Sequence, residues 1–155
     1  MQLLHLSNEN EYYEHFVEKY CKVEKYTCEN IRVKFYEDQF YHAFYESKDR
    51  KKRDKSVFSI ERAERMDWIE QVLMNKNVEK YVGWDRDKKR YNYNRRVSII
   101  TKENYVVILN IINKKEAKFI TAYVASKTNA IKIRKAPIWD ENKNTTDYWF
   151  SSGNL

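Results

Sequence analysis

SIERAERMDWIEQVLMN, residues 59–75, has the clearest helical periodicity in the chain. At 100° per residue its apolar side chains gather on one side of a helix; they are Ala63, Met66, Ile69, Val72 and Leu73. Arg62 projects near the middle of that side, and Arg65 lies on its flank. A charged group is costly to bury without an anionic partner. Arg62 is therefore expected to meet either a buried carboxylate or an anion that enters a pocket.

Three strand-like runs follow this helix, at Tyr91–Thr101, Tyr105–Ile112 and Lys118–Ser126. The connections between them, residues 102–104 and 113–117, are short enough to require hairpins, which predicts an antiparallel meander. Strict alternation along the last run places on one face the residues Phe119, Thr121, Tyr123 and Ala125.

The N-terminal part of the chain is expected to add a helix and a strand. Ser7 is a suitable N-cap for an amphipathic helix over residues 9–23, and we interpret His15 on its flank as solvated. Residues 29–36 alternate apolar and polar side chains, as a half-buried strand does. The predicted fold class is α+β: an antiparallel sheet of about four strands, with the meander in the C-terminal half and helices packed on one face.

Length and composition limit the classes of protein to consider. The 155 residues have the size of one domain, which we place at residues 1–138, followed by a C-terminal tail over residues 139–155. The net charge of +7 favours a polyanionic partner over a merely basic surface. Cys21 and Cys28 show no disulfide or metal spacing, and no apolar run reaches the roughly 18 residues of a membrane span, so a cytoplasmic location is expected.

Several classes of site lack their sequence signals. The three histidines are scattered and lie apart from both cysteines, so no metal site is expected. Gly83 and Gly153 stand too far apart to form a phosphate-binding glycine loop. The elbow motif of serine and cysteine hydrolases is also absent, and no cofactor is predicted.

Residues 37–47, EDQFYHAFYES, contain a histidine of interest. If this segment is extended, His42 shares a side with Phe40 and Phe44. An imidazole held among aromatic rings is positioned and partly desolvated, which suits it to proton transfer near neutral pH. The competing interpretation is a core histidine whose ring binds a backbone carbonyl.

Basic residues gather in two further places. Residues 48–55, KDRKKRDK, form a charge run without an apolar residue, which predicts a solvated loop. The neighbouring Arg95 and Arg96 lie in a predicted strand. The expected contacts to a nucleic-acid backbone are Lys51, Lys52, Arg53, Arg95 and Arg96.

These residue types suit metal-independent RNA cleavage. In that reaction the 2′-hydroxyl loses a proton, the phosphorane carries extra negative charge, and the leaving 5′-oxygen gains a proton. Histidine serves as base or acid, and arginines stabilise the phosphorane. Tyrosines and tryptophans stack exposed bases. A basic, tyrosine-rich RNA-binding protein without catalysis would show much of the same pattern.

Four segments resemble, in the same order, phage-encoded proteins of the barnase/EndoU/colicin/RelE-like nuclease superfamily; they are FYHAF (40–44), FSIERAERMDWIEQVL (58–73), YVGWD (81–85) and FITAYVAS (119–126). The resemblance covers about residues 31–138. It implies helices before a four-stranded antiparallel sheet that carries a metal-independent endoribonuclease site. By the same resemblance His42 is the acid/base residue, Arg62 and Arg65 bind phosphate, and Thr121 and Tyr123 line the site.

The resemblance and the basic charge together favour a toxin-like endoribonuclease of phage origin that acts in the bacterial cytoplasm. Its expected partners are RNA and a cognate inhibitor protein, with neither a membrane nor a metal ion. Two alternatives remain open. One is a nucleic-acid-binding module without catalysis, and the other is a phage protein-interaction module in which Arg62 is ion-paired in the core.

Overall fold

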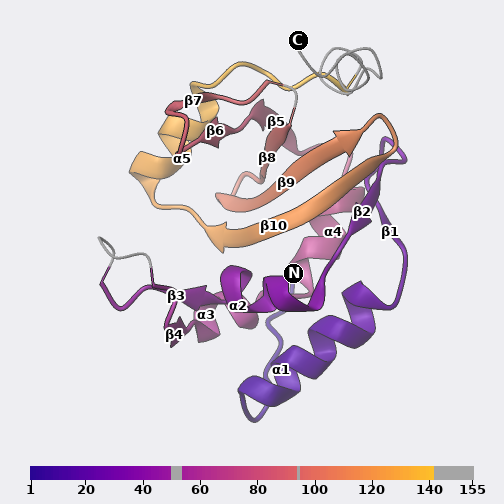
Figure 1. Ribbon diagram of the computed structural model, residues 1–155, viewed down its shortest axis with the longest axis vertical. Coiled ribbons are helices and arrows are strands. Elements are labelled where there is room, and N and C mark those ends of the chain that lie inside the picture. Colours follow the sequence, from indigo (N-terminus) through magenta and orange to yellow (C-terminus); the bar gives the residue numbers. More distant parts are fainter. Residues whose placement is uncertain (50–53, 94, 142–155) are drawn as a thin grey trace.

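The computed structural model describes residues 1–49, 54–93 and 95–141. A twisted six-stranded sheet in the order β1-β2-β10-β9-β8-β5 forms its centre (Figure 1). Its strands are β1 (Lys25–Tyr26), β2 (Arg32–Lys34), β5 (Glu79–Val82), β8 (Arg96–Ile100), β9 (Tyr105–Asn113) and β10 (Glu116–Val124). The α+β class and the antiparallel meander β8–β9–β10 are confirmed, but the sheet has more strands than the four predicted.

The strand predicted over residues 29–36 is confirmed as β2, which runs parallel to β10 with Val33 opposite Ala117, so the sheet is not wholly antiparallel as predicted. The additional strands are β1 and β5, and β1 pairs with the free edge of β2. At the other edge β5 pairs antiparallel with β8. Local periodicity does not encode which distant strand a segment joins, so neither edge was predictable from the pattern alone.

The predicted helix over residues 59–75 is two short helices, α3 (Ile60–Ala63) and α4 (Trp68–Met74). Between them the backbone tightens to i→i−3 hydrogen bonds, including Met66 N–H to the Ala63 carbonyl at 3.0 Å and Trp68 N–H to the Arg65 carbonyl at 2.9 Å. The expectation of one continuous helix is therefore wrong.

Carbonyl groups at this break find donors elsewhere in the chain. The Glu64 carbonyl accepts from Leu4 N–H (2.7 Å), and the Met66 carbonyl accepts from the Tyr20 hydroxyl (2.6 Å). The Arg65 carbonyl also accepts from the Tyr105 hydroxyl at 3.3 Å. These tertiary bonds replace i→i−4 helix bonds, so the break leaves no backbone acceptor of these three residues unsatisfied.

The predicted apolar stripe survives the break. Its five members are each at most 2% exposed and form part of the larger core; they are Ala63, Met66, Ile69, Val72 and Leu73. On the same face of the sheet pack α1 (Glu9–Phe16) and the π-helical turn η1 (Val17–Cys21) through Phe16 and Tyr20. The predicted first helix is confirmed, with Asn8 rather than Ser7 as its N-cap.

Helices cover both faces of the sheet, which corrects the prediction of one covered face. α5 (Lys127–Arg134) packs through Ala130 onto Ile100 and Val106, whose side chains point away from the larger core. In Figure 1, α1 lies at the bottom and α5 at the upper left, with β9 and β10 between them. Trp139, the first residue of the expected tail, is 6% exposed and packs in the larger core; residues 142–155 lie outside the described ranges.

Residues 37–47 are largely helical, where an extended segment was considered. They form a 3-10 turn, η2 (Glu37–Gln39), and the short helix α2 (Phe40–Ala43). Two small hairpins complete the fold: β3 (Tyr45–Glu46) with β4 (Val57–Phe58), and β6 (Trp84–Asp85) with β7 (Arg90–Tyr91). Among the described residues no helix combines the length and apolar character needed to cross a bilayer.

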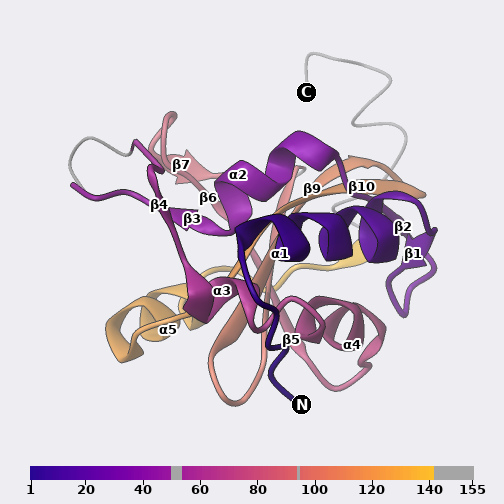
Figure 2. The same ribbon diagram turned by 90° about the horizontal axis from the view of Figure 1, so that it is seen from below.

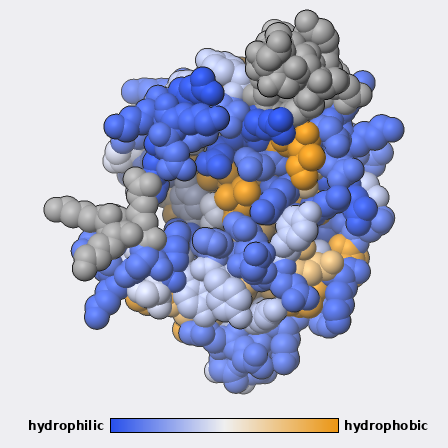
Figure 3. Space-filling view, in the orientation of Figure 1, coloured by the Kyte–Doolittle hydropathy of each residue, from blue (hydrophilic) through white to orange (hydrophobic). Residues whose placement is uncertain are grey.

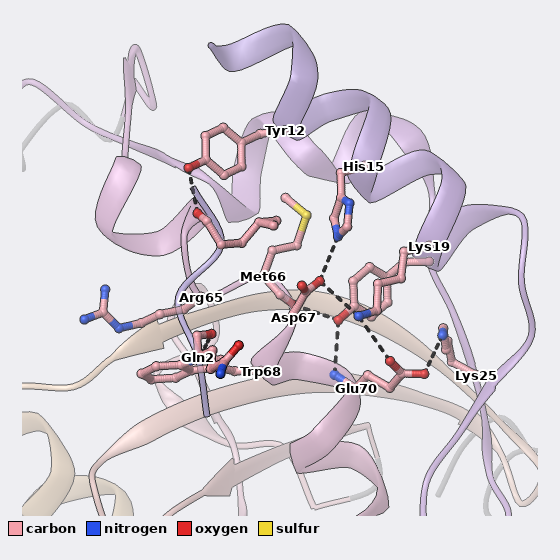
Figure 4. Close-up of polar contacts among 12 residues, drawn as sticks. Gln2, Tyr12, His15, Lys19, Lys25, Arg65, Met66, Asp67, Trp68 and Glu70 are labelled. Atoms are coloured by element: carbon pink, nitrogen blue, oxygen red, sulfur yellow. Dashed lines mark hydrogen bonds and ion pairs between the residues drawn. The ribbon is translucent and has the colours of Figure 1, made fainter. Parts of the chain in front are cut away.

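A polar network ties α1 to the break between α3 and α4 (Figure 4). His15 Nε2 lies 2.7 Å from Asp67 Oδ1, and Lys19 Nζ lies 3.0 Å from the same oxygen. His15 therefore contacts Asp67, the residue that precedes α4, and is not merely solvated as expected. Partial burial opposes ionisation of Asp67, but the bonds from His15 and Lys19 outweigh it and lower the pKa of the carboxyl.

The N-terminal segment is held by the same region. It passes between α3 and α4 (Figure 2), where the indole N–H of Trp68 donates to the Gln2 carbonyl at 2.8 Å. The Tyr12 hydroxyl donates to the Leu4 carbonyl at 2.8 Å. The chain thus anchors its first residues to the helices that follow β4.

We expect Asp67→Asn to lower the free energy of unfolding at pH 7 by about 1 kcal/mol, because His15 and Lys19 lose an anionic acceptor at a partly exposed site. The folded-state pKa of Asp67 is lowered, so its stabilisation is present above the unfolded pKa and is lost as pH falls through the folded value. The free energy of unfolding, measured with urea, should therefore differ less between wild type and variant below about pH 4.

Glu18→Gln is the matched control, since Glu18 of η1 pairs with Lys22 just beyond it and both side chains are exposed. It should change the free energy of unfolding by less than about 0.5 kcal/mol. Equal effects of the two substitutions would contradict a special role for the Asp67 network.

Candidate functional site

A β-bulge in β10 decides which residues share a face. Phe119 pairs with Leu109 and Thr121 pairs with Ile108, so Ile120 is the extra residue. Beyond the bulge the alternation is inverted: Phe119 and Ala122 lie in the larger core, while Tyr123 packs against the smaller core under α5. Thr121 and Tyr123 therefore lie on the face opposite Phe119, which corrects the prediction of a shared face.

The bulge is held from the neighbouring helical turn. Gln39 Nε2 donates to the Ile120 carbonyl at 2.6 Å, which satisfies a carbonyl that the β9–β10 ladder leaves out. This contact places α2 and α3 beside the second half of β10, beyond the part that β2 covers. Arg62, at the end of α3, can consequently reach across the strand to Tyr123.

The Arg62 guanidinium carbon lies 5.3 Å from the centre of the Tyr123 ring, a cation–π distance. Arg62 Nη1 is 3.5 Å from the Ala43 carbonyl, and Nε is 3.4 Å from Glu46 Oε1. Both contacts are long for a charged hydrogen bond. The Glu46 side chain is 52% exposed, against 19% for Arg62, so the partner of this arginine is not a buried carboxylate.

Two further cations lie within electrostatic range of Arg62 and Tyr123. Burial first, and then the charges of Arg62 and Arg86, lower the pKa of Lys55, while Glu46 opposes them. Burial raises the pKa of Tyr123, and the same two arginines oppose that rise. We call Lys55, Arg62 and Arg86 the cation cluster; the exposed carboxylate of Glu46 lies 3.4 Å from its member Arg62.

Separate parts of the chain supply the cluster. Lys55 comes from the segment before β4, Arg62 from the end of α3, and Arg86 from the turn of the β6–β7 hairpin. The hydroxyl of Tyr123 donates to Asn129 Oδ1 of α5 at 3.0 Å, which fixes the ring beneath Arg62. Figure 3 shows the surface hollowed between the hydrophilic groups at the upper left and lower left, with paler and apolar groups at the bottom of the hollow.

The same sheet face carries polar atoms without a partner. Thr121 Oγ1 and Arg96 Nε are buried and have no hydrogen-bond partner among the described residues. Arg96 pairs with Asn110, two positions after Ile108 along β9 and farther from Tyr123, which pairs with Val106. Its stem packs over Gly83, where an added Cβ would lie 2.1 Å from Arg96 Cγ. Only glycine leaves room for this side chain to lie across the strand.

His42 does not occupy either predicted environment. It lies in α2 and is exposed. In a helix, residues i and i+4 share a face and i+2 projects on the opposite side, so Phe40 and Phe44 enter the core while His42 faces outward. No hydrogen bond or ion pair to His42 occurs within the described ranges, but the next residue, Ala43, supplies the carbonyl near Arg62.

Arg65 is separated from Arg62 by its contacts. Its Nη1 donates to the Glu61 carbonyl at 2.7 Å and to Glu64 Oε1 at 3.0 Å. Its guanidinium stacks 5.0 Å from the Trp68 ring, beside the N-terminal segment (Figure 4). The structure therefore brings Arg62 and Tyr123 together, and it places Arg65 in a different environment.

The residues predicted to contact a nucleic-acid backbone lie in different environments. Arg96 lies on the site face, and Arg95 is exposed. Lys51, Lys52 and Arg53 lie outside the described residues. Sequence reasoning missed Lys55 and Arg86 as site residues; Lys55 ends the recognised charge run, but no spacing rule connects it with Arg86.

Comparisons with known proteins add no relative. No protein-family model matches the chain, and no curated protein or solved structure matches it significantly. Within the described part of the chain, no three His, Cys, Asp or Glu side chains are grouped as metal ligands would be. The site is therefore interpreted from its own geometry.

We expect Lys55→Met to raise the free energy of unfolding at neutral pH and low ionic strength, by less than about 1 kcal/mol because the group is half exposed. The folded-state pKa of Lys55 is lowered, so its protonated form costs stability until pH rises through that value. Methionine keeps the apolar stem and removes the charge.

Urea unfolding at about 20 mM and 500 mM salt measures this effect, which should shrink at the higher concentration because mobile ions screen the cluster. Lys76→Met, at an exposed position beyond α4, is the matched control. A loss of stability in Lys55→Met would show that the charge is paired in the folded state and not repelled.

Proposed function

We propose that this protein is a metal-independent endoribonuclease that binds the RNA phosphate at the cation cluster. The observation that supports the proposal most strongly is that Arg62 packs 5.3 Å from the Tyr123 ring with a long 3.4 Å contact to the half-exposed Glu46, while the charges of Arg62 and Arg86 act on Lys55. Like charges held together are costly unless an anion binds among them. A phosphate group satisfies the cluster, and guanidinium groups match its oxygens geometrically.

In the proposed reaction His42 takes the proton of the 2′-hydroxyl as this oxygen attacks phosphorus. The bond from phosphorus to the 5′-oxygen then breaks, and the protonated His42 returns the proton to that oxygen. Arg62 and Arg86 stabilise the extra negative charge of the phosphorane. Thr121 lies on the same sheet face, and its buried hydroxyl has no hydrogen-bond partner among the described residues; in this proposal it lines the site, as the resemblance implies.

The proposed setting follows the sequence resemblance: a toxin-like, phage-encoded protein of the barnase/EndoU/colicin/RelE-like superfamily, acting in the bacterial cytoplasm and countered by an inhibitor protein. Arg65 has no catalytic role in this proposal, because its Nη1 donates to the Glu61 carbonyl and to Glu64 and its guanidinium stacks on Trp68, away from Arg62.

A second candidate function is RNA binding without cleavage. The exposed position of His42, with no partner to orient its ring among the described residues, favours this alternative, because general bases are normally oriented by a second group. The protein-interaction alternative is less well supported, since the carboxylate beside Arg62 is half exposed and does not form a core ion pair.

Incubation of the purified protein with mixed cellular RNA in the presence of a chelator tests the proposal. We expect cleavage with 2′,3′-cyclic phosphate ends. Rates should fall by a factor on the order of 100 or more in both His42→Ala and Arg62→Ala, since one removes proton transfer and the other charge stabilisation.

Two substitutions serve as matched controls. Arg65→Ala removes an arginine of equal side-chain exposure, 19%, and His5→Ala removes an exposed histidine near the N-terminus. Both should cleave at nearly the wild-type rate. Intact RNA combined with salt-dependent binding would support the non-catalytic alternative, and unchanged cleavage in Arg62→Ala would refute the assigned site.

A further inference from the structure

The β6–β7 hairpin presents aromatic rings beside the cation cluster. Trp84 and Tyr91 face each other across the hairpin with ring centres 5.2 Å apart and planes at 85°. Tyr91 in turn meets Tyr93 at 6.3 Å. Trp84 is 51% exposed, as is Tyr93. The edge-to-face contact thus fixes the orientation of the indole and leaves about half of the Trp84 surface exposed to solvent.

The base of this hairpin is fixed to the sheet. Gly83 N–H donates to the Arg96 carbonyl at 2.9 Å, and Asn92 N–H donates to the Gly83 carbonyl at 2.8 Å. Arg96 covers Gly83 so closely that no larger residue fits. The indole therefore projects from an anchored position, which reduces the entropy that a bound partner would have to remove.

The charge around the indole is complementary to a polyanion. Residues 85–90, DRDKKR, contain four basic and two acidic residues. The carboxylate of Asp85 accepts from the backbone N–H groups of Asp87 (3.0 Å) and Lys88 (3.1 Å), so it serves the turn itself. An exposed aromatic ring within a basic turn is the combination that single-stranded nucleic-acid sites use.

Arg86 connects this hairpin with the cation cluster. It lies two residues from Trp84, and its charge acts on both Lys55 and Tyr123. A chain whose phosphate binds among Lys55, Arg62 and Arg86 therefore passes close to the indole. In a duplex both faces of each base are covered by its neighbours, whereas an unpaired base can offer a face to a ring.

We propose that Trp84 stacks on an unpaired base next to the phosphate held by the cation cluster, which makes single-stranded RNA the preferred ligand. This inference rests on the proposed function, because it requires a phosphate at the cluster. It extends that function by assigning the hairpin as the element that distinguishes single strands from duplexes.

Binding is measured by fluorescence anisotropy with a labelled 2′-O-methyl oligouridine of about twelve nucleotides, which lacks the attacking hydroxyl and spans a typical single-strand site. The comparison ligand is the duplex of this strand with 2′-O-methyl oligoadenosine. Trp84→Ala should raise the Kd for the single strand about tenfold and leave the duplex Kd unchanged within about twofold. Trp84→Phe, which keeps an aromatic ring, should recover most of the affinity.

Met74→Ala is the matched control, because Met74 is 55% exposed in α4, whose buried residues pack in the larger core on the opposite face of the sheet. Arg62→Ala should lower the slope of log Kd against log salt concentration by about one, while Trp84→Ala leaves that slope unchanged. The stacking proposal is wrong if Trp84→Ala binds the single strand as tightly as Met74→Ala does. It is also wrong if Trp84→Ala loses affinity equally for the single strand and the duplex. An unchanged slope in Arg62→Ala overturns the phosphate site instead, so the two failures are distinguishable.

Discussion

The hydrogen bond from Gln39 Nε2 to the Ile120 carbonyl is the contact on which the site depends. It captures the backbone group that the bulge in β10 removes from the ladder, and it brings α2 and α3 against the second half of that strand. Without the bulge, Thr121 and Tyr123 would point into the larger core with Phe119. One extra residue therefore determines whether a tyrosine ring lies under Arg62.

A second constraint is the accumulation of positive charge around that ring. Lys55, Arg62 and Arg86 come from separate segments, and the exposed carboxylate of Glu46 partly opposes the charges of Lys55 and Arg62. Folding brings these charges together against their mutual repulsion, which costs stability at neutral pH. Such a cost is common at binding sites, where a ligand later supplies the opposite charge.

Around Asp67 and Glu70, by contrast, the positive charges are paired with carboxylates. There Lys19 and Lys25 meet Asp67 and Glu70 at distances between 2.7 and 3.3 Å, and His15 joins them. Each charge has a partner, and the pKa values of both carboxyls are lowered. Paired charges attach α1, η1 and β1 to the first part of α4, whereas in the cation cluster Arg62 has a long 3.4 Å contact to the half-exposed Glu46.

The sequence by itself determined the apolar stripe from Ala63 to Leu73, the antiparallel meander and the excess of positive charge, because hydrophobic period and composition are local properties. The tertiary structure alone decided where the guanidinium group of Arg62 lies and which face of the sheet carries Tyr123. It also decided that Lys55 and Arg86 lie near these two residues. Those outcomes depend on backbone groups finding partners far along the chain: the Glu64 carbonyl meets Leu4, and the Ile120 carbonyl meets Gln39. Periodicity carries no record of such pairings, so it identified Arg62 and Tyr123 as candidates but not the cluster that surrounds them.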